Sequence, residues 1–185
     1  MESVYVDKHF DLVVECKQGS KKAHYELYKL YSKAMLNTAF RIVDNLDEAQ
    51  DVLQEAFLDA FARISDFRQE TTFGLWLKQI VVHRAINLLR KRKMDLVSID
   101  DEQIEIADED YDDGEETIYK AEQIKAAIKL LPEGYRVVLS LYLLEGYDHE
   151  EIGEIMNINQ NTSRTQFLRA KRKLIEILKQ RGIVS

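Results

Sequence analysis

The chain has little glycine, proline or cysteine. Its 185 residues include 7 Gly, 1 Pro and 1 Cys. Because so few residues interrupt regular structure, while Leu, Ala, Lys, Glu and Ile are abundant, the composition favours helices and argues against an all-β or Rossmann-like fold. The single cysteine, Cys16, excludes an internal disulfide and a thiolate metal cluster. We interpret it as a small, partly buried apolar residue on a helix.

Long apolar runs and convergent reactive groups are also missing. No stretch approaches the ~18 apolar residues of a membrane-spanning helix, and Met1–Asp7 lacks the basic and then apolar layout of a signal peptide. We therefore expect a cytoplasmic protein without membrane insertion. The four histidines are dispersed, without metal-ligand spacing or a partner nucleophile. The sequence thus predicts no enzyme, no catalytic residue, no metal and no cofactor.

The negative charge is concentrated in one segment. The whole chain carries 26 basic and 33 acidic residues, a net charge of -7 that by itself argues against nucleic-acid binding. Asp95–Glu116, however, holds 12 carboxylates and no Lys or Arg. Residues 1–94 carry +2 and residues 120–185 carry +3. The acidic character therefore belongs to one segment between two weakly basic parts.

Apolar residues recur at helical spacing in eight segments, and no strand is convincing. The segments are Phe10–Lys17, Ala23–Val43, Asp47–Ile64, Thr72–Lys93, Ile118–Leu131, Glu133–Leu144, His149–Met156 and Asn161–Leu178. The periodicity stops between Met94 and Thr117, as in a solvated linker. We predict an all-α protein of two small helical domains, residues 1–93 and 120–185, joined by a flexible acidic linker over 94–119.

The stretch from Glu150 to Thr162 has the pattern of a helix-turn-helix. Ile152, Ile155 and Met156 would face inward on a short helix. Asn157 tolerates the left-handed conformation that a tight turn needs. Asn159 is a suitable N-cap for the following helix.

The following helix has two contrasting faces. Ser163, Phe167, Ala170, Leu174 and Ile177 share one side and should face the core. Seven basic residues and one acid lie between Arg164 and Arg181. Short polar side chains near the start suit base edges and later cations suit phosphates, although a merely solvated basic helix is the alternative. The predicted DNA-binding residues are Asn161, Thr162, Arg164, Thr165, Leu168, Arg169 and Arg172.

The helix that begins near Asp47 carries an acidic stripe, Glu48, Asp51, Glu55 and Asp59, bordered by Gln54. Acidic residues near a helix N-terminus stabilise the helix through its dipole, which is the simpler interpretation. Four like charges in line also repel one another, so the stripe indicates a basic partner.

The helix from Thr72 to Lys93 contains six cations and no acid. We expect Phe73, Leu77, Ile80, Val81 and Leu88 to form its core face. A second, polar stripe combines an aromatic ring that can stack on a base with polar side chains that can hydrogen-bond its edge, namely Trp76, Gln79, His83, Asn87 and Arg90. A Trp packed into the core is the alternative. The loop before the helix contains one aromatic, Phe67, and could receive a flipped base. The predicted single-strand contacts are Phe67, Trp76, Gln79, His83, Asn87, Arg90, Lys91 and Arg92.

Taken in order, four segments resemble the extracytoplasmic-function (ECF) group of bacterial sigma factors, within the sigma-70 family. The resemblance covers Phe10 to Leu178. Its carriers are Asp47–Phe57, Phe73–Ile80 with the ending Arg90–Lys93, Leu131-Pro132, and Glu145-Gly146-Tyr147. The second helix of the helix-turn-helix departs from the family at Ser163, where relatives often have a β-branched residue.

The resemblance implies a role for each surface. Glu48, Asp51, Gln54 and Glu55 would dock on a coiled coil of the largest subunit of RNA polymerase. The Thr72–Lys93 helix would read the downstream promoter element as single strand, and the helix-turn-helix would read the upstream element in duplex DNA. The acidic linker would run through the polymerase. The alternative is that the linker is only a solubilising tether. The partners are then RNA polymerase core and promoter DNA, with an anti-sigma factor left open.

The function expected from the sequence is therefore that of an alternative sigma factor, which directs promoter-specific transcription initiation. A free-standing helix-turn-helix transcriptional regulator is the alternative, although it leaves the acidic stripe and the first domain unexplained. A pure protein-interaction module is a third possibility, and it predicts no DNA contact even with polymerase present.

Overall fold

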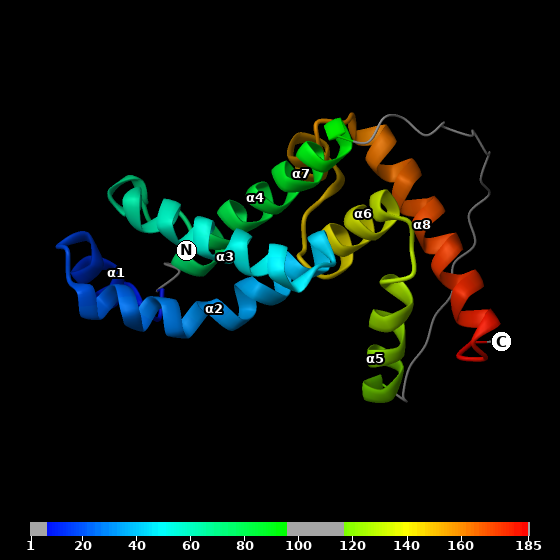
Figure 1. The fold of residues 1–185 in the computed structure, drawn as a ribbon, viewed down its shortest axis with the longest axis horizontal. Coiled ribbons are helices and arrows are strands. Elements are labelled where there is room, and N and C mark those ends of the chain that lie inside the picture. The colour runs from blue at the N-terminus through cyan, green and yellow to red at the C-terminus, as the bar shows by residue number, and fades with distance from the viewer. Residues whose placement is uncertain (1–6, 96–116, 185) are drawn as a thin grey trace, which may run out of the picture. The chain divides into compact units, whose positions relative to one another are not determined.

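The computed structural model describes residues 7–95 and 117–184, and every regular element within these ranges is a helix (Figure 1). The chain divides into two compact units, Met1–Asp95 and Leu96–Ser185. The predicted all-α class and the pair of small helical domains are thus confirmed. Most of the acidic linker predicted for 94–119 lies outside the described residues.

The first unit is built on three long helices that pack against one another. A short helix α1 precedes them, and one turn of 3-10 helix, η1 (Ile64–Asp66), follows α3. The helices are α1 (Phe10–Lys17), α2 (Lys21–Val43), α3 (Leu46–Ala62) and α4 (Phe73–Asp95). Leu27 and Ile42 of α2, Phe57 of α3 and Leu77 of α4 are buried in their common core.

The turn between α2 and α3 is only two residues long. Asp44 has a left-handed conformation (φ 54°), and the Asn45 side chain accepts a hydrogen bond from the Glu48 N–H (3.1 Å). Such a short connection makes the two helices antiparallel neighbours. The acidic stripe begins in the first turn of α3, at Glu48.

Helix α4 begins at a tightly packed point of the first unit. The Asp7 carboxylate accepts a hydrogen bond from the Phe73 N–H (2.7 Å), so a residue far away in sequence caps the helix. A Cβ added to Gly74 would lie 2.7 Å from Cε1 of the Tyr31 ring, and a larger residue there would therefore displace the ring.

The buried surface of α4 is wider than the sequence predicted. Phe73, Leu77 and Val81 are fully buried as expected, but Ile80 and Leu88 are only half-buried. The additional buried residues are Val82, Ala85, Ile86 and Leu89. The physical reason is that α4 packs against both α2 and α3, so two sides of the helix are covered rather than one.

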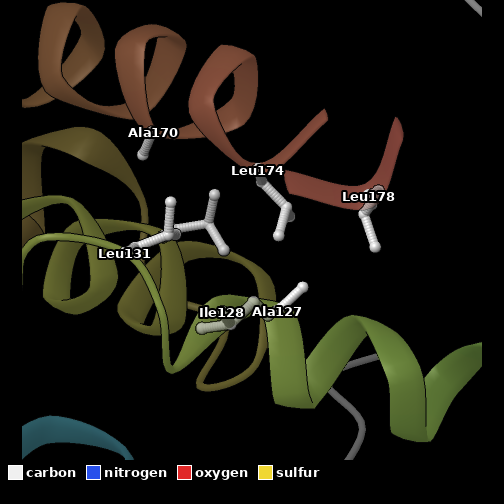
Figure 2. Close-up of a cluster of buried hydrophobic side chains, with 7 residues drawn as sticks. Ala127, Ile128, Leu131, Ala170, Leu174 and Leu178 are labelled. Atoms are coloured by element: carbon white, nitrogen blue, oxygen red, sulfur yellow. The ribbon is translucent and has the colours of Figure 1, made fainter. Parts of the chain in front are cut away.

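The second unit packs three helices around its last and longest one. Its helices are α5 (Thr117–Ile128), α6 (Glu133–Leu143), α7 (His149–Met156) and α8 (Gln160–Gln180). Figure 2 shows Ala170, Leu174 and Leu178 of α8 facing a second group from the end of α5 and the residues after it. The second group is Ala127, Ile128 and Leu131.

The predicted core face of α8 is nearly correct. Ser163, Ala170 and Leu174 are buried, Phe167 and Ile177 are half-buried, and Leu178 is buried in addition.

Candidate nucleic-acid and protein interfaces

The α7–turn–α8 segment has the geometry of a helix-turn-helix. At the start of α7, the Asp148 carboxylate accepts from two backbone N–H groups while the Glu151 carboxylate accepts from the Asp148 N–H (2.8 Å), a complete capping box. Asn157 ends α7 with φ 55°, and the Asn159 side chain caps α8 by accepting from the Thr162 N–H (2.7 Å). The roles predicted for Asn157 and Asn159 are confirmed.

A glycine allows the turn to lie against α7. A Cβ added to Gly153 would come within 2.8 Å of the Ile158 carbonyl oxygen, a backbone atom that cannot rotate away. Gly153 is also buried. Close contact between the helix and the turn therefore fixes the angle at which α8 leaves.

Helix α8 presents most of the predicted DNA-binding side chains to solvent. Asn161, Arg164, Thr165 and Arg172 are exposed, whereas Thr162, Leu168 and Arg169 are half-buried. The Thr165 hydroxyl donates a hydrogen bond to the Asn161 carbonyl (2.9 Å). The exposed set combines short polar groups with guanidinium groups, the mixture that can contact base edges and phosphates.

A polar contact joins the two helices of the motif. His149 Nδ1 and the hydroxyl of the fully buried Ser163 lie 2.9 Å apart. The His149 ring also stacks on Tyr142, with centroids 4.6 Å apart. The pKa of His149 is lowered below its ordinary value, mainly by desolvation and to a smaller extent by the positive charge of Arg164. The negative charge of Asp148 partly opposes this lowering.

The acidic stripe of α3 is largely paired inside the first unit. The Arg84 guanidinium of α4 donates to Asp59 (Nε to Oδ2, 2.7 Å) and to Glu55 (Nη1 to Oε2, 3.1 Å). Arg92 donates from Nε to Oε1 of Glu48 (3.0 Å). The basic partner that the stripe indicated is therefore supplied in part by the protein itself.

One residue of the stripe, and Gln54 beside it, remain open to solvent. Asp51 and Gln54 are both exposed, and Asp51 forms no ion pair with any residue that the structure describes. Glu55 keeps 61% of its side chain exposed in spite of its contact with Arg84. Glu48 is half-buried beneath Arg92.

The polar stripe of α4 borders a hollow of about 300 Å³ at the α3–α4 junction. Gln79, His83 and Asn87 are exposed along it, and Trp76 is half-buried at one end. Asp59, Arg63 and Arg84 also line the hollow, which the sequence did not predict. The complete lining is Asp59, Arg63, Trp76, Gln79, Ile80, His83, Arg84 and Asn87.

The aromatic residue of the loop before α4 lies in the core. Phe67 is 3% exposed, and its ring packs against Trp76 (centroids 5.1 Å apart) and Phe73 (6.0 Å). Lys17 of α1 holds the loop by donating from Nζ to the Phe67 carbonyl (2.8 Å). The Phe67 ring is therefore part of the core in this structure, packed against Trp76 and Phe73, and its contact with a base stays a prediction.

The end of α4 also differs in part from expectation. Arg92 is half-buried, bound to Glu48 and within 3.4 Å of the Val43 carbonyl oxygen, so its guanidinium is used within the unit. A DNA contact of Arg92 does not fit this arrangement. Arg90 and Lys91 are exposed as predicted.

Residues 7–95 and 117–184 contain neither a candidate metal site nor a helix that could cross a membrane. No three His, Cys, Asp or Glu side chains gather there in a way that could hold a metal ion. In the same residues, none of the helices combines the length and the apolar character needed to cross a membrane.

Two family matches, one in each unit, define the class of this chain, the sigma-70 proteins. Residues 27–94, within the first unit, match the family "Sigma-70 region 2", and residues 121–174, within the second, match "Sigma-70, region 4". Both family matches occur in the order that the resemblance required.

Similar curated proteins identify the group within the sigma-70 family to which the chain belongs. The RNA polymerase sigma factor SigV of Bacillus subtilis is 34% identical over 86% of both chains. The ECF RNA polymerase sigma-E factor of Haemophilus influenzae is 33% identical over 89% of this chain and 92% of the relative. The chain belongs to the ECF group of RNA polymerase sigma factors, whose role is promoter-directed transcription initiation.

Solved structures agree in fold. The sigma factor RpoE in complex with the anti-sigma factor NepR, from Bartonella quintana, matches with a TM-score of 0.54 at 22% identity, covering 84% of this chain and 96% of that one. CnrH in complex with the cytosolic domain of CnrY matches with a TM-score of 0.57 at 18% identity, covering 95% and 99%.

Proposed function

We propose that this protein binds RNA polymerase core and directs it to promoters of a particular sequence, without catalysing a reaction itself. The observation that supports this most is the similarity to sigma factors over 86% of the chain, together with family matches over 27–94 and 121–174 that include both surfaces described above. The proposal divides the chain into a polymerase-binding and downstream-reading domain (1–93), a spacer (94–119) and an upstream-reading domain (120–185).

The polymerase-docking face is proposed to be the acidic side of α3. The sequence resemblance assigns Glu48, Asp51, Gln54 and Glu55 to it. Asp51 and Gln54 are exposed, and Glu55 is mostly so, which gives a basic partner direct access. We expect Asp51 to dominate the electrostatic attraction, because Glu48 and Glu55 already face arginines of the same unit.

The downstream promoter element is proposed to bind along α4 as single strand. The half-buried Trp76 ring can stack on a base, and Gln79, His83 and Asn87 line the adjacent hollow. His83 Nδ1 lies 2.7 Å from the Gln79 carbonyl oxygen and must donate to it. In the neutral ring Nε2 is then a hydrogen-bond acceptor, which would select for a donor group on the base. Arg90 and Lys91 would contact phosphates.

The upstream element is proposed to bind α8 in the duplex major groove. Asn161, Thr162, Arg164 and Thr165 lie in the first turns, where side chains reach base edges. Later residues of the helix, Arg169 and Arg172 among them, would contact phosphates. Leu168 would supply an apolar contact.

The charge distribution explains why polymerase is needed. With only +2 and +3 on the two weakly basic parts, binding of the free protein to DNA should be weak and strongly salt dependent. Polymerase that is already held on DNA raises the effective concentration of both surfaces.

An anti-sigma factor is a further proposed partner. The sigma factor RpoE of Bartonella quintana was solved in complex with one. The fold that this chain shares with it is the support for testing such a partner here.

The test is transcription in vitro with purified core polymerase on genomic DNA, with and without the protein. New start sites are expected only with the protein present. Asp51→Arg should weaken core binding by more than about tenfold, because it places a cation opposite a basic partner. Asp11→Arg makes the same charge change at an exposed residue of α1 and should bind core as the wild type does.

Two results would count against the proposal. One is the absence of new start sites, and the other is equal core binding by both variants. A sequence-specific duplex footprint without polymerase would favour the free-standing regulator instead.

A further inference from the structure

His149, at the start of α7, is tied to α8 through only one of its two ring nitrogens. Its Nδ1 lies 2.9 Å from the hydroxyl of the fully buried Ser163. Its Nε2 forms no hydrogen bond with any residue that the structure describes, and it is not among the buried unpartnered atoms. The half-buried ring therefore presents Nε2 to solvent or to a ligand.

Aromatic rings from two other helices hold the His149 ring in place. Tyr142 of α6 stacks on it, with an interplanar angle of 18° and ring centroids 4.6 Å apart. Phe167 of α8 lies edge-on to the His149 ring (5.5 Å) and also packs against Tyr142 (4.6 Å). Because the ring is already ordered, a ligand that binds Nε2 does not have to immobilise this side chain.

The charged groups around the ring favour an anion once His149 carries a proton. From α8, the positive charge of Arg164 acts on the ring, and from α6 the titratable group that faces it is Tyr142. Asp148 contributes a negative charge, but its carboxylate already accepts from two backbone N–H groups of α7, and Glu151 belongs to the same cap. An anion between Arg164 and a protonated His149 would therefore lie beside two cations.

The helix-turn-helix geometry brings such an anion to this place. When the second helix of the motif lies in the major groove, the first helix crosses the DNA backbone. His149 begins the first helix, α7, and the exposed Arg164 lies near the start of the second, α8. The phosphate closest to the junction of the two helices would therefore approach both side chains.

Ser163 lets His149 change its protonation state without losing its partner. A serine hydroxyl can donate to a neutral imidazole nitrogen, and it can also accept from the N–H of an imidazolium. An apolar side chain at this buried position would leave the Nδ1–H of the imidazolium without an acceptor, which is costly away from water. The serine and the histidine are therefore needed together.

We propose that His149 is a further DNA contact of the helix-turn-helix, which as the imidazolium donates from Nε2–H to a backbone phosphate and from Nδ1–H to Ser163. This inference rests on the proposed function, in which α8 binds duplex DNA. In the free protein, desolvation and Arg164 lower the pKa of His149, whereas a phosphate beside the ring raises it. DNA binding therefore takes up a proton, and the affinity for DNA increases as pH falls.

The first test follows duplex binding by the full-length free protein. The probe is a short duplex DNA of randomised sequence at low salt, measured by anisotropy. The affinity of the wild type should rise about fivefold between about pH 8 and about pH 6, where histidine titrates. His149→Gln should remove most of this rise, whereas His24→Gln makes the same change on α2 of the first unit and should keep it. NMR titration should give a higher His149 pKa with the duplex than without it.

The second test compares Ser163→Thr with Ser163→Val, which have nearly the same shape and differ in the hydroxyl. Ser163→Thr should keep the rise in affinity at low pH, because the hydroxyl can still accept from Nδ1–H. Ser163→Val should lose the rise, although both variants crowd the same buried position. Thermal melts check folding, and Ser163→Ala removes the hydroxyl without crowding if Ser163→Val does not fold.

The outcomes separate this inference from the proposed function. Arg164→Gln should weaken duplex binding at about pH 8, where His149 is neutral. If it does, and His149→Gln keeps the pH dependence of the wild type, the histidine contact is overturned while binding through α8 stands. An equal rise in Ser163→Val and Ser163→Thr would overturn the role of the serine. Unchanged binding by Arg164→Gln, or no duplex binding by the wild type, would overturn both this inference and the proposed upstream contact.

Discussion

At the residue scale, His149 and Ser163 form the most specific contact of the helix-turn-helix. Ser163 is fully buried at a position where the family resemblance leads one to expect a β-branched residue, and its hydroxyl lies 2.9 Å from His149 Nδ1. A buried hydroxyl without such a partner would be costly. The serine and the histidine are therefore best understood as a pair that joins α7 to α8.

This pair predicts a pH dependence of stability in the second unit. The pKa of His149 is lowered by desolvation and by Arg164, so the unfolded chain binds a proton at a higher pH than the folded one. The stabilisation is complete above the ordinary histidine pKa of about 6.5 and is lost as pH falls from there through the folded-state pKa. The effect should be small, because the half-buried ring is partly screened by solvent.

NMR titration of the His149 ring measures the pKa directly. Arg164→Gln should move it back towards the ordinary value, and His149→Gln should remove the corresponding slope from the free energy of unfolding. A His149 pKa at or above about 6.5 would contradict the prediction.

Residue-scale roles were the least predictable part of the sequence. Phe67 and Trp76 are both aromatic and both were predicted to contact a base, yet Phe67 is buried and Trp76 is half-buried at the hollow. The difference arises because the Phe67 ring packs against Trp76 and Phe73, while Lys17 of α1 holds the loop through the Phe67 carbonyl. No local pattern carries that information.

At the scale of elements, the close approach of α7 and its turn sets the direction of α8. Gly153→Ala would place a methyl group 2.8 Å from the Ile158 carbonyl oxygen. We expect a loss of about 1–3 kcal/mol in the stability of the second unit, with weaker upstream-element use, because the turn must shift.

Gly134→Ala is the matched control for Gly153→Ala. Gly134 lies in the first turn of α6, and an added Cβ there meets no atom within 4 Å. Alanine should stabilise this helix by roughly 0.4–1 kcal/mol. Chemical denaturation measures both variants, and a Gly153→Ala protein as stable as Gly134→Ala would show that the turn is not tightly packed.

The pairing of α3 with α4 is also a property of elements. The ion pairs run in opposite order along the two helices: Glu48, early in α3, meets Arg92, late in α4, while Asp59 meets Arg84. Antiparallel neighbours require this order. The sequence shows an acidic helix followed by a basic one, and antiparallel packing could have suggested their mutual neutralisation.

At the scale of the whole molecule, each unit has its own buried core, and the acidic segment separates them in sequence. We predict that a fragment of residues 1–95 folds alone and melts within about 4 °C of the corresponding transition in the full chain, since a larger difference would mean that roughly 1 kcal/mol comes from outside it. Circular dichroism during heating measures both. An unfolded fragment would contradict the proposed domain boundary.

The sequence by itself determined the all-α class, two helical domains and the helix-turn-helix. These follow from helical spacing of apolar residues, from capping residues such as Asn159 and from the turn residue Asn157, all of which act within a few positions of the chain.

Only the tertiary structure decided which charged and aromatic side chains remain available to a partner. It placed Arg84 and Arg92 against the acidic stripe, buried Phe67 and covered two sides of α4. The physical reason is that pairing and burial depend on contacts between residues far apart in sequence, which helical periodicity cannot specify.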